Sequence, residues 1–233
     1  MTDRAASPAP ATSTSAESPA GPTVERLLQR HGRTFADELG IDLRGGGPEA
    51  LFELLTASLL MSARISSDIA LAAARALYDH GCSGAQEMFD TSWQERVDAL
   101  GEGSYVRYDE STATYLGETA QLTLDRYDGD LNQLRDTADR DPERIHRRLQ
   151  DFKGIGRLGA DIFCREAQHV WEELRPFADA KAIEVAEQLG LGASAEELAE
   201  LVGDHDLSQL TAALIRAERA DDLDQVRATS EGE

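Results

Sequence analysis

Two closely spaced glycines give residues 149–160 the clearest potential for ligand chemistry in this chain. The segment reads Leu-Gln-Asp-Phe-Lys-Gly-Ile-Gly-Arg-Leu-Gly-Ala, so Gly154 and Gly156 flank Ile155. Glycine accepts a positive φ and lets a ligand approach the backbone closely. We therefore predict a tight turn here, with Ile155 directed inward to fix it.

Helical patterns lie on both sides of this turn, over residues 143–151 and 157–170. The second helix would begin just after Gly156, where its first backbone N–H groups have no partner within the helix. A helix start of this kind binds phosphate. Gly159 and Ala160 are small enough for two helices to pack closely. Two short helices joined in this way can hold a DNA backbone without reading its base sequence.

Basic side chains gather around the predicted turn, although the whole chain has a formal net charge of −21. That acidity argues against a broad attraction to nucleic acid, because neutralising phosphates requires Lys and Arg. Residues 144–165 nevertheless carry six Lys and Arg side chains against Asp151 and Asp161, a local net charge of +4. We interpret this basic island as a footprint for DNA. The alternative is a glycine-containing turn between helices with solvated arginines.

Together these residues resemble the hairpin of the endonuclease III-like (HhH-GPD) superfamily of helix-hairpin-helix DNA glycosylases. A second block, residues 177–191, resembles the family's Asp-containing loop and places Asp179 on its catalytic aspartate. A third, residues 59–68, is similar to the stretch that carries a DNA-inserting glutamine, with Arg64 in its place. The resemblance spans about residues 25–220. It implies two helical lobes with a DNA-binding cleft between them.

The resemblance also implies roles for individual side chains in base-excision repair. Asp179 would stabilise positive charge on the sugar and activate water while a damaged base is expelled. Arg64 would fill the space that a flipped-out base leaves. An ordinary helix cap is the alternative role for Asp179, and the two roles are compatible. The implied DNA-binding residues are Arg64, Lys153, Gly154, Ile155, Gly156, Arg157 and Gly159.

Three departures from the family pattern bear on the chemistry. Leu158 stands where the bifunctional enzymes carry a lysine, and leucine cannot form a Schiff base. Lys181 occupies the place of a frequent histidine, and is either a replacement amine or a solvated surface lysine. With only Cys82 and Cys164, the chain lacks the family's four-cysteine iron–sulfur motif. We therefore expect no iron–sulfur cluster, no metal, no other cofactor and a monofunctional hydrolase.

The remaining sequence predicts an all-α fold with about ten short helices. Residues 1–22 are rich in Ala, Ser, Thr and Pro and predict a disordered tail. From the resemblance we assign residues 23–48 and 166–233 to one lobe, and residues 49–165 to a lobe that ends in the hairpin. We also expect one helix from Thr23 to a stop at Gly40 and a last helix over 206–217. Helix caps are expected at Thr91/Gln94, Asp141 and Ser194/Glu197. Both cysteines should be reduced and packed, and Trp93 and Trp171 should lie in the core.

Composition narrows the class of protein. No apolar run approaches the ~20 residues of a membrane-spanning helix, and the N-terminal residues lack the apolar stretch of a secretory signal. We expect a cytoplasmic monomer whose partner is double-stranded DNA, including lesion-containing DNA. The principal interpretation is a DNA glycosylase that uses Asp179. The alternatives are a catalytically inactive DNA-binding protein of the same fold, and a protein-interaction module.

Overall fold

All regular elements in the described part of the chain are helices, as the sequence predicts. The computed structural model describes residues 21–202 and 206–227. The α-helices are α1 (Gly21–His31), α2 (Phe35–Leu39), α3 (Pro48–Met61), α4 (Ser67–Asp79), α5 (Ala85–Asp90), α6 (Trp93–Glu102), α7 (Asp109–Tyr127), α8 (Leu131–Thr137), α9 (Pro142–Leu149), α10 (Arg157–Ala167), α11 (Ala180–Leu189), α12 (Ala195–Val202), α13 (Leu207–Arg219) and α14 (Leu223–Arg227). Two 3₁₀ turns, η1 (Leu43–Gly45) and η2 (Glu172–Leu174), complete the set.

The N-terminal boundaries differ from the prediction. Most of the expected tail, residues 1–20, lies outside the described residues, and Gly21 and Pro22 already belong to α1. The single helix expected from Thr23 to Gly40 is two helices. Thr34 interrupts it, because its side chain accepts a hydrogen bond from the Asp37 N–H at 3.0 Å and caps α2.

Helix caps explain the other boundaries. Asp141 accepts from the Arg144 N–H at 2.9 Å, as expected. The capping box predicted at Thr91 is wrong by one residue, since Ser92 accepts from the Glu95 N–H and donates its own N–H to the Glu95 carboxylate. The Ser194 hydroxyl accepts from the Glu197 N–H at 3.2 Å. The helix predicted over 206–217 is present as α13, which ends at Arg219, but it is not the last helix, because α14 follows it.

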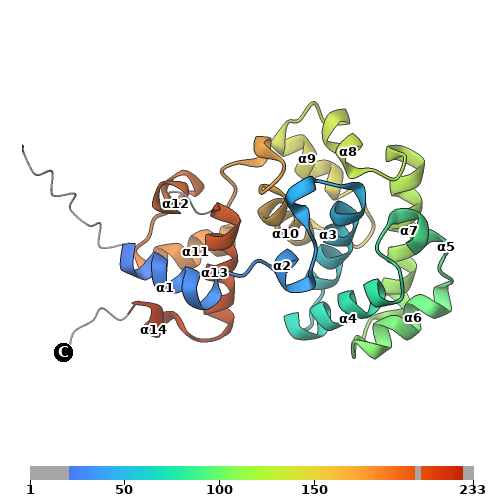
Figure 1. Ribbon diagram of the computed structural model, residues 1–233, viewed down its shortest axis with the longest axis horizontal. Coiled ribbons are helices and arrows are strands. Elements are labelled where there is room, and N and C mark those ends of the chain that lie inside the picture. Colours follow the sequence, from blue (N-terminus) through green and yellow to red (C-terminus); the bar gives the residue numbers. More distant parts are fainter. Residues whose placement is uncertain (1–20, 203–205, 228–233) are drawn as a thin grey trace, which may run out of the picture.

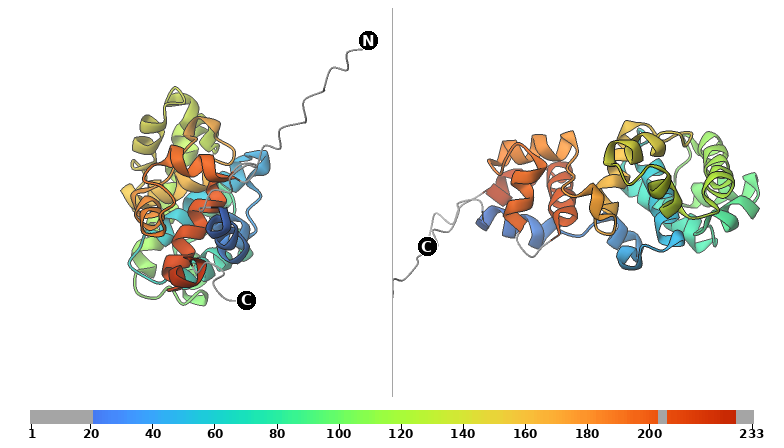
Figure 2. Two further views of the ribbon diagram at one scale, coloured as in Figure 1. Left: turned by 90° about the vertical axis from the view of Figure 1, so that its left-hand side faces the viewer. Right: turned by 90° about the horizontal axis from the view of Figure 1, so that it is seen from above.

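The helices gather at the two ends of an elongated molecule (Figures 1 and 2). At one end, α1 and α11–α14 enclose an apolar core that includes Leu27, Val185, Leu214 and Val226. At the other end, α2–α10 enclose two more clusters, one around Phe52 and Leu77 and one around Leu51 and Trp171. The first and last described helices therefore share one core, and the hairpin lies in the other half.

Two segments that we grouped with the terminal lobe contribute to the core of the middle helices. Ala36, Ile41 and Leu43 pack in the same cluster as Leu51. Trp171 and Leu174 follow α10 and pack there too. Both cysteines are free and buried, as expected.

Candidate nucleic-acid interface

The hairpin forms where the glycine spacing predicts it, between α9 and α10. Gly154 has a φ of +89°, and Ile155 is buried with its N–H bonded to the Phe152 carbonyl at 3.0 Å. Gly156 differs from the expectation, because its φ of −90° and ψ of −166° are extended backbone. Gly154 therefore makes the turn, and Gly156 occupies the N-cap position of α10 without a side-chain cap.

The start of α10 offers backbone donors to the surface. Gly156 has no side chain with which to cap the helix. The N–H groups of Arg157, Leu158 and Gly159 bond to no other described residue. Gly156, Arg157 and Leu158 are exposed. These donors lie at the positive end of the helix dipole, and they can donate hydrogen bonds to a phosphate oxygen.

Close packing brings Arg64 to the same face as the hairpin. A Cβ at Gly159 would lie 3.5 Å from the Ser62 side chain, so the start of α10 lies against the end of α3. Arg64, two residues further on, lines a shallow depression together with Gly154 and Tyr115. The structure thus unites two of the segments that the resemblance selected, although they are about ninety residues apart in the sequence.

Most basic side chains of the island form ion pairs with acidic side chains. Arg147 is the exception among the described residues. The Lys153 ammonium is 3.1 Å from the Glu118 carboxylate and 5.4 Å from the centre of the Tyr115 ring. Exposed ion pairs contribute little to stability, so a phosphate can replace the Glu118 carboxylate at a small cost in free energy. The other pairs are Arg144–Asp139, Arg148–Asp151, Arg157–Asp161, His146–Asp161 and the buried pair Arg165–Asp179.

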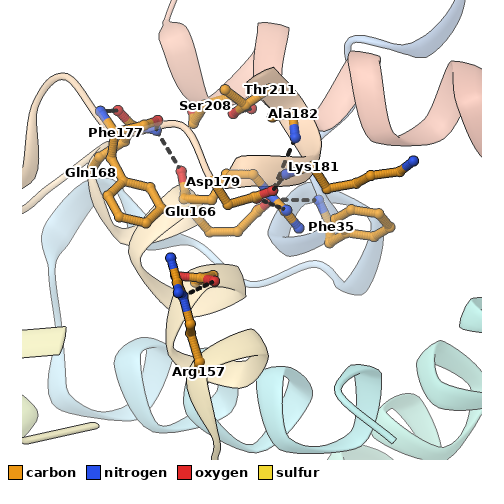
Figure 3. A network of polar contacts seen from close by, with 12 residues as sticks. Phe35, Arg157, Glu166, Gln168, Phe177, Asp179, Lys181, Ala182, Ser208 and Thr211 are labelled. Atoms are coloured by element: carbon orange, nitrogen blue, oxygen red, sulfur yellow. Dashed lines mark hydrogen bonds and ion pairs between the residues drawn. The ribbon is translucent and has the colours of Figure 1, made fainter. Parts of the chain in front are cut away.

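Asp179 lies apart from Arg157 (Figure 3), and both of its carboxylate oxygens accept hydrogen bonds. One carboxylate oxygen accepts the N–H groups of Lys181 and Ala182, each at 3.0 Å, and so caps α11. The other accepts from the Arg165 guanidinium at 2.6 Å, in an ion pair in which both side chains are about 95% buried. The cap is the alternative role that the sequence left open. The buried partner Arg165 was not foreseen.

Lys181 points away from Asp179 (Figure 3) and contacts acidic side chains. Its ammonium is 2.7 Å from the Glu218 carboxylate and 3.3 Å from that of Glu184. The hydrogen bond to Glu218 raises the pKa of Lys181. A Schiff base needs the neutral amine, so these contacts favour the surface-lysine interpretation. Leu158 is 56% exposed beside the hairpin.

A second buried carboxylate, missed by sequence reasoning, joins α10 to α2. Glu166 accepts the N–H groups of Ala36 at 3.0 Å and Phe35 at 3.4 Å. Burial raises the pKa of Glu166, and the nearby Arg165 opposes that shift. No local pattern reveals this contact, because its partners are about 130 residues apart.

The two hairpin glycines make a matched pair for a stability test. We expect Gly154→Ala to lower the free energy of unfolding by about 1–3 kcal/mol, because φ is positive there. The new Cβ would also lie 2.8 Å from the Tyr115 ring. Gly156→Ala should change stability by less than about 0.5 kcal/mol, since nothing lies within 4 Å of its Cβ. Urea unfolding of both variants checks this, and equal losses would contradict the turn geometry.

Comparisons of this chain with models of protein families, with curated proteins and with solved structures gave no match. None of the described helices is long and apolar enough to cross a membrane. Over the same residues, no group of three or more His, Cys, Asp or Glu side chains is placed to hold a metal ion.

Proposed function

We propose that this chain binds double-stranded DNA through the backbone donors and basic side chains of its hairpin, as a two-lobed helix-hairpin-helix protein of the DNA-glycosylase type. The uncapped start of α10 carries the proposal. Arg157 and Leu158, which carry two of its donors, are exposed, and Gly156 adds no side chain in front of them. Backbone amides contact phosphates rather than base edges, so the binding would be independent of base sequence.

Arg64 extends the proposed contact beyond the hairpin. It is exposed and lines the same depression as Gly154. A strand whose phosphate lies on the α10 start would therefore pass close to this guanidinium. In the glycosylase interpretation Arg64 would enter the DNA duplex at the position that the flipped-out base vacates. In the inactive alternative it would contact the backbone or a groove.

Salt dependence of binding tests the proposal. Fluorescence anisotropy with a labelled duplex should give an affinity that falls steeply as salt rises. Lys153→Gln/Arg157→Gln should weaken binding and reduce the slope of log K against log salt by about 2, since each lost phosphate contact removes about 0.9. The matched control is Arg44→Gln/Arg227→Gln, which neutralises two exposed arginines outside the hairpin. Equal slopes for the two double variants would refute the hairpin contact.

Glycosylase chemistry is the second candidate, and the position of Asp179 at the start of α11 favours it. Its carboxylate would have to turn from Arg165 toward a sugar in the DNA complex. Duplexes carrying oxidised pyrimidines, alkylated purines or uracil should then yield strand breaks that depend on the protein and that appear only after hot alkali. A duplex with a preformed abasic site tests for lyase cleavage before alkali, and it should stay intact. Asp179→Asn should abolish the alkali-dependent product, and borohydride should trap no adduct. Salt-sensitive binding without any product would leave the catalytically inactive alternative.

A further inference from the structure

An arginine-rich cleft lies between the two halves of the molecule, away from the hairpin turn. Its walls come from the end of α1, from α2, from the start of α4 and from the end of α13, and its volume is about 820 Å³. Arg30, Arg33, Arg216 and Arg219 line it against the carboxylates of Glu38 and Asp68. Such a local excess of positive charge is unexpected in a chain with a net charge of −21.

Among the described residues, two of the four arginines that line the cleft form ion pairs, and the other two, Arg33 and Arg219, do not. Arg30 pairs with Asp222 at 2.9 Å, and Arg216 pairs with Glu38 at 2.5 Å. Arg33 instead donates to the Asp37 carbonyl, and Arg219 donates to the Ser67 hydroxyl. Neither Arg33 nor Arg219 has a carboxylate within ion-pair distance among the described residues, and both are exposed.

Three guanidinium groups surround the ring of Phe35, which lines the cleft. The guanidinium carbons of Arg216, Arg165 and Arg219 lie 4.1, 5.7 and 5.9 Å from the centre of the Phe35 ring. Partial desolvation lowers the pKa of Arg219, the charges of Arg165 and Arg216 lower it further, and those of Glu218 and Asp179 oppose the shift. The Arg216 Nε is buried and bonds to no described residue. An anion in the cleft would interact favourably with the guanidinium groups of Arg216 and Arg219.

The turn between α3 and α4 connects the cleft to the hairpin face. Ser62 contacts the start of α10, and Arg64 lines the depression beside Gly154. The next residues, Ile65 to Ser67, line the arginine cleft. A strand that crosses this turn can therefore reach both places.

We propose that the arginine cleft binds a phosphate group through Arg33 and Arg219, as a second backbone contact for the DNA strand held at the hairpin. The DNA part of this inference rests on the proposed function. A guanidinium fork fits the geometry of phosphate oxygens and stays charged at any physiological pH. Free phosphate shares this chemistry, so the test has one arm for each source.

The DNA arm compares Arg33→Gln/Arg219→Gln with the wild-type protein and with Arg44→Gln/Arg227→Gln. We expect the cleft variant to bind duplex DNA about tenfold or more weakly, with a salt slope reduced by about 0.9. The second arm measures the thermal midpoint in inorganic phosphate and in chloride at equal ionic strength. Phosphate should raise the midpoint of the wild-type protein and of the control more than that of the cleft variant, which keeps only the donors of the hairpin. Far-UV circular dichroism confirms that each variant is folded.

The outcomes separate the two proposals. If the cleft variant equals the control in both arms while Lys153→Gln/Arg157→Gln loses DNA affinity, the cleft inference is overturned and the hairpin proposal stands. A phosphate response smaller than that of the control, with unchanged DNA binding, assigns the cleft to free phosphate and overturns its role in DNA binding. If the wild-type protein binds no DNA, the proposed function fails. The phosphate arm alone then decides whether the cleft is an anion site.

Discussion

Asp179→Ala should lower the free energy of unfolding by about 3–5 kcal/mol, which is the usual effect of removing one partner of a buried ion pair. The substitution leaves the Arg165 guanidinium buried without its carboxylate, 4% exposed. It also removes the acceptor for two N–H groups at the start of α11. Urea unfolding followed by circular dichroism at neutral pH measures the loss.

Two further variants identify the cause. Asp179→Asn keeps an oxygen for the α11 cap but loses the charge and the oxygen that accepts from Arg165, so it should fall between the wild type and Asp179→Ala. Arg165→Met in the Asp179→Ala background removes the stranded charge and should recover part of the stability. A loss of less than about 1 kcal/mol in Asp179→Ala, as for an exposed pair, would show that the two side chains do not pair in solution.

The structural role of Asp179 must be separated from a catalytic role in any activity experiment. A residue that joins α10 to α11 can abolish activity when it is substituted, without touching a substrate. Loss of product in Asp179→Asn therefore supports catalysis only where the variant retains its fold and its DNA affinity. Unchanged DNA binding with lost product would identify Asp179 as catalytic.

Trp171→Ala should also be strongly destabilising, by about 3–5 kcal/mol. The indole is fully buried, packs against Phe163 with ring centres 5.3 Å apart, and donates its N–H to the Asn132 side chain at 3.1 Å. Truncation leaves a cavity beneath α8 and α10 and an unsatisfied amide oxygen. Guanidinium unfolding measures the effect, with tryptophan fluorescence as a second readout.

Trp93 supplies the matched control, and it corrects the prediction that both tryptophans lie in the core. Trp93 is the first residue of α6, and its side chain is 41% exposed. The indole N–H donates to both the Glu110 carbonyl and the Thr114 hydroxyl. Trp93→Ala should therefore lower stability by about 1 kcal/mol or less. Equal losses in the two variants would contradict the packing described for Trp171.

The hairpin was predictable because its determinants are local. Gly154, Ile155 and Gly156 specify a turn and a bare helix start through conformational preferences that act within a few residues. The same applies to the cap at Asp141. The misplaced box at Thr91 shows the limit of such patterns, since adjacent capping residues satisfy the same spacing and only packing selects Ser92.

The contacts of the candidate catalytic residue were not predictable, because they depend on tertiary structure. Arg165 counted as one charge of the basic island, whereas it turns inward to Asp179. Phe35, Arg216 and Arg219 meet only after the ends of the chain come together. Nothing in the spacing of these residues indicates that they share one cleft, and side-chain direction at the end of α10 decides which positive charges face the solvent.

The packing of α1 against α13 has a consequence for synthesis on the ribosome. Leu27 is buried among side chains of the C-terminal helices, including Leu214, so its partners emerge almost a full chain length later. At translation rates of about 5–20 residues per second, the apolar face of α1 stays uncovered for about ten to forty seconds. The middle helices can pack during this time. A nascent chain stalled just before α13 should therefore present α1 to chaperones while its hairpin half is already folded.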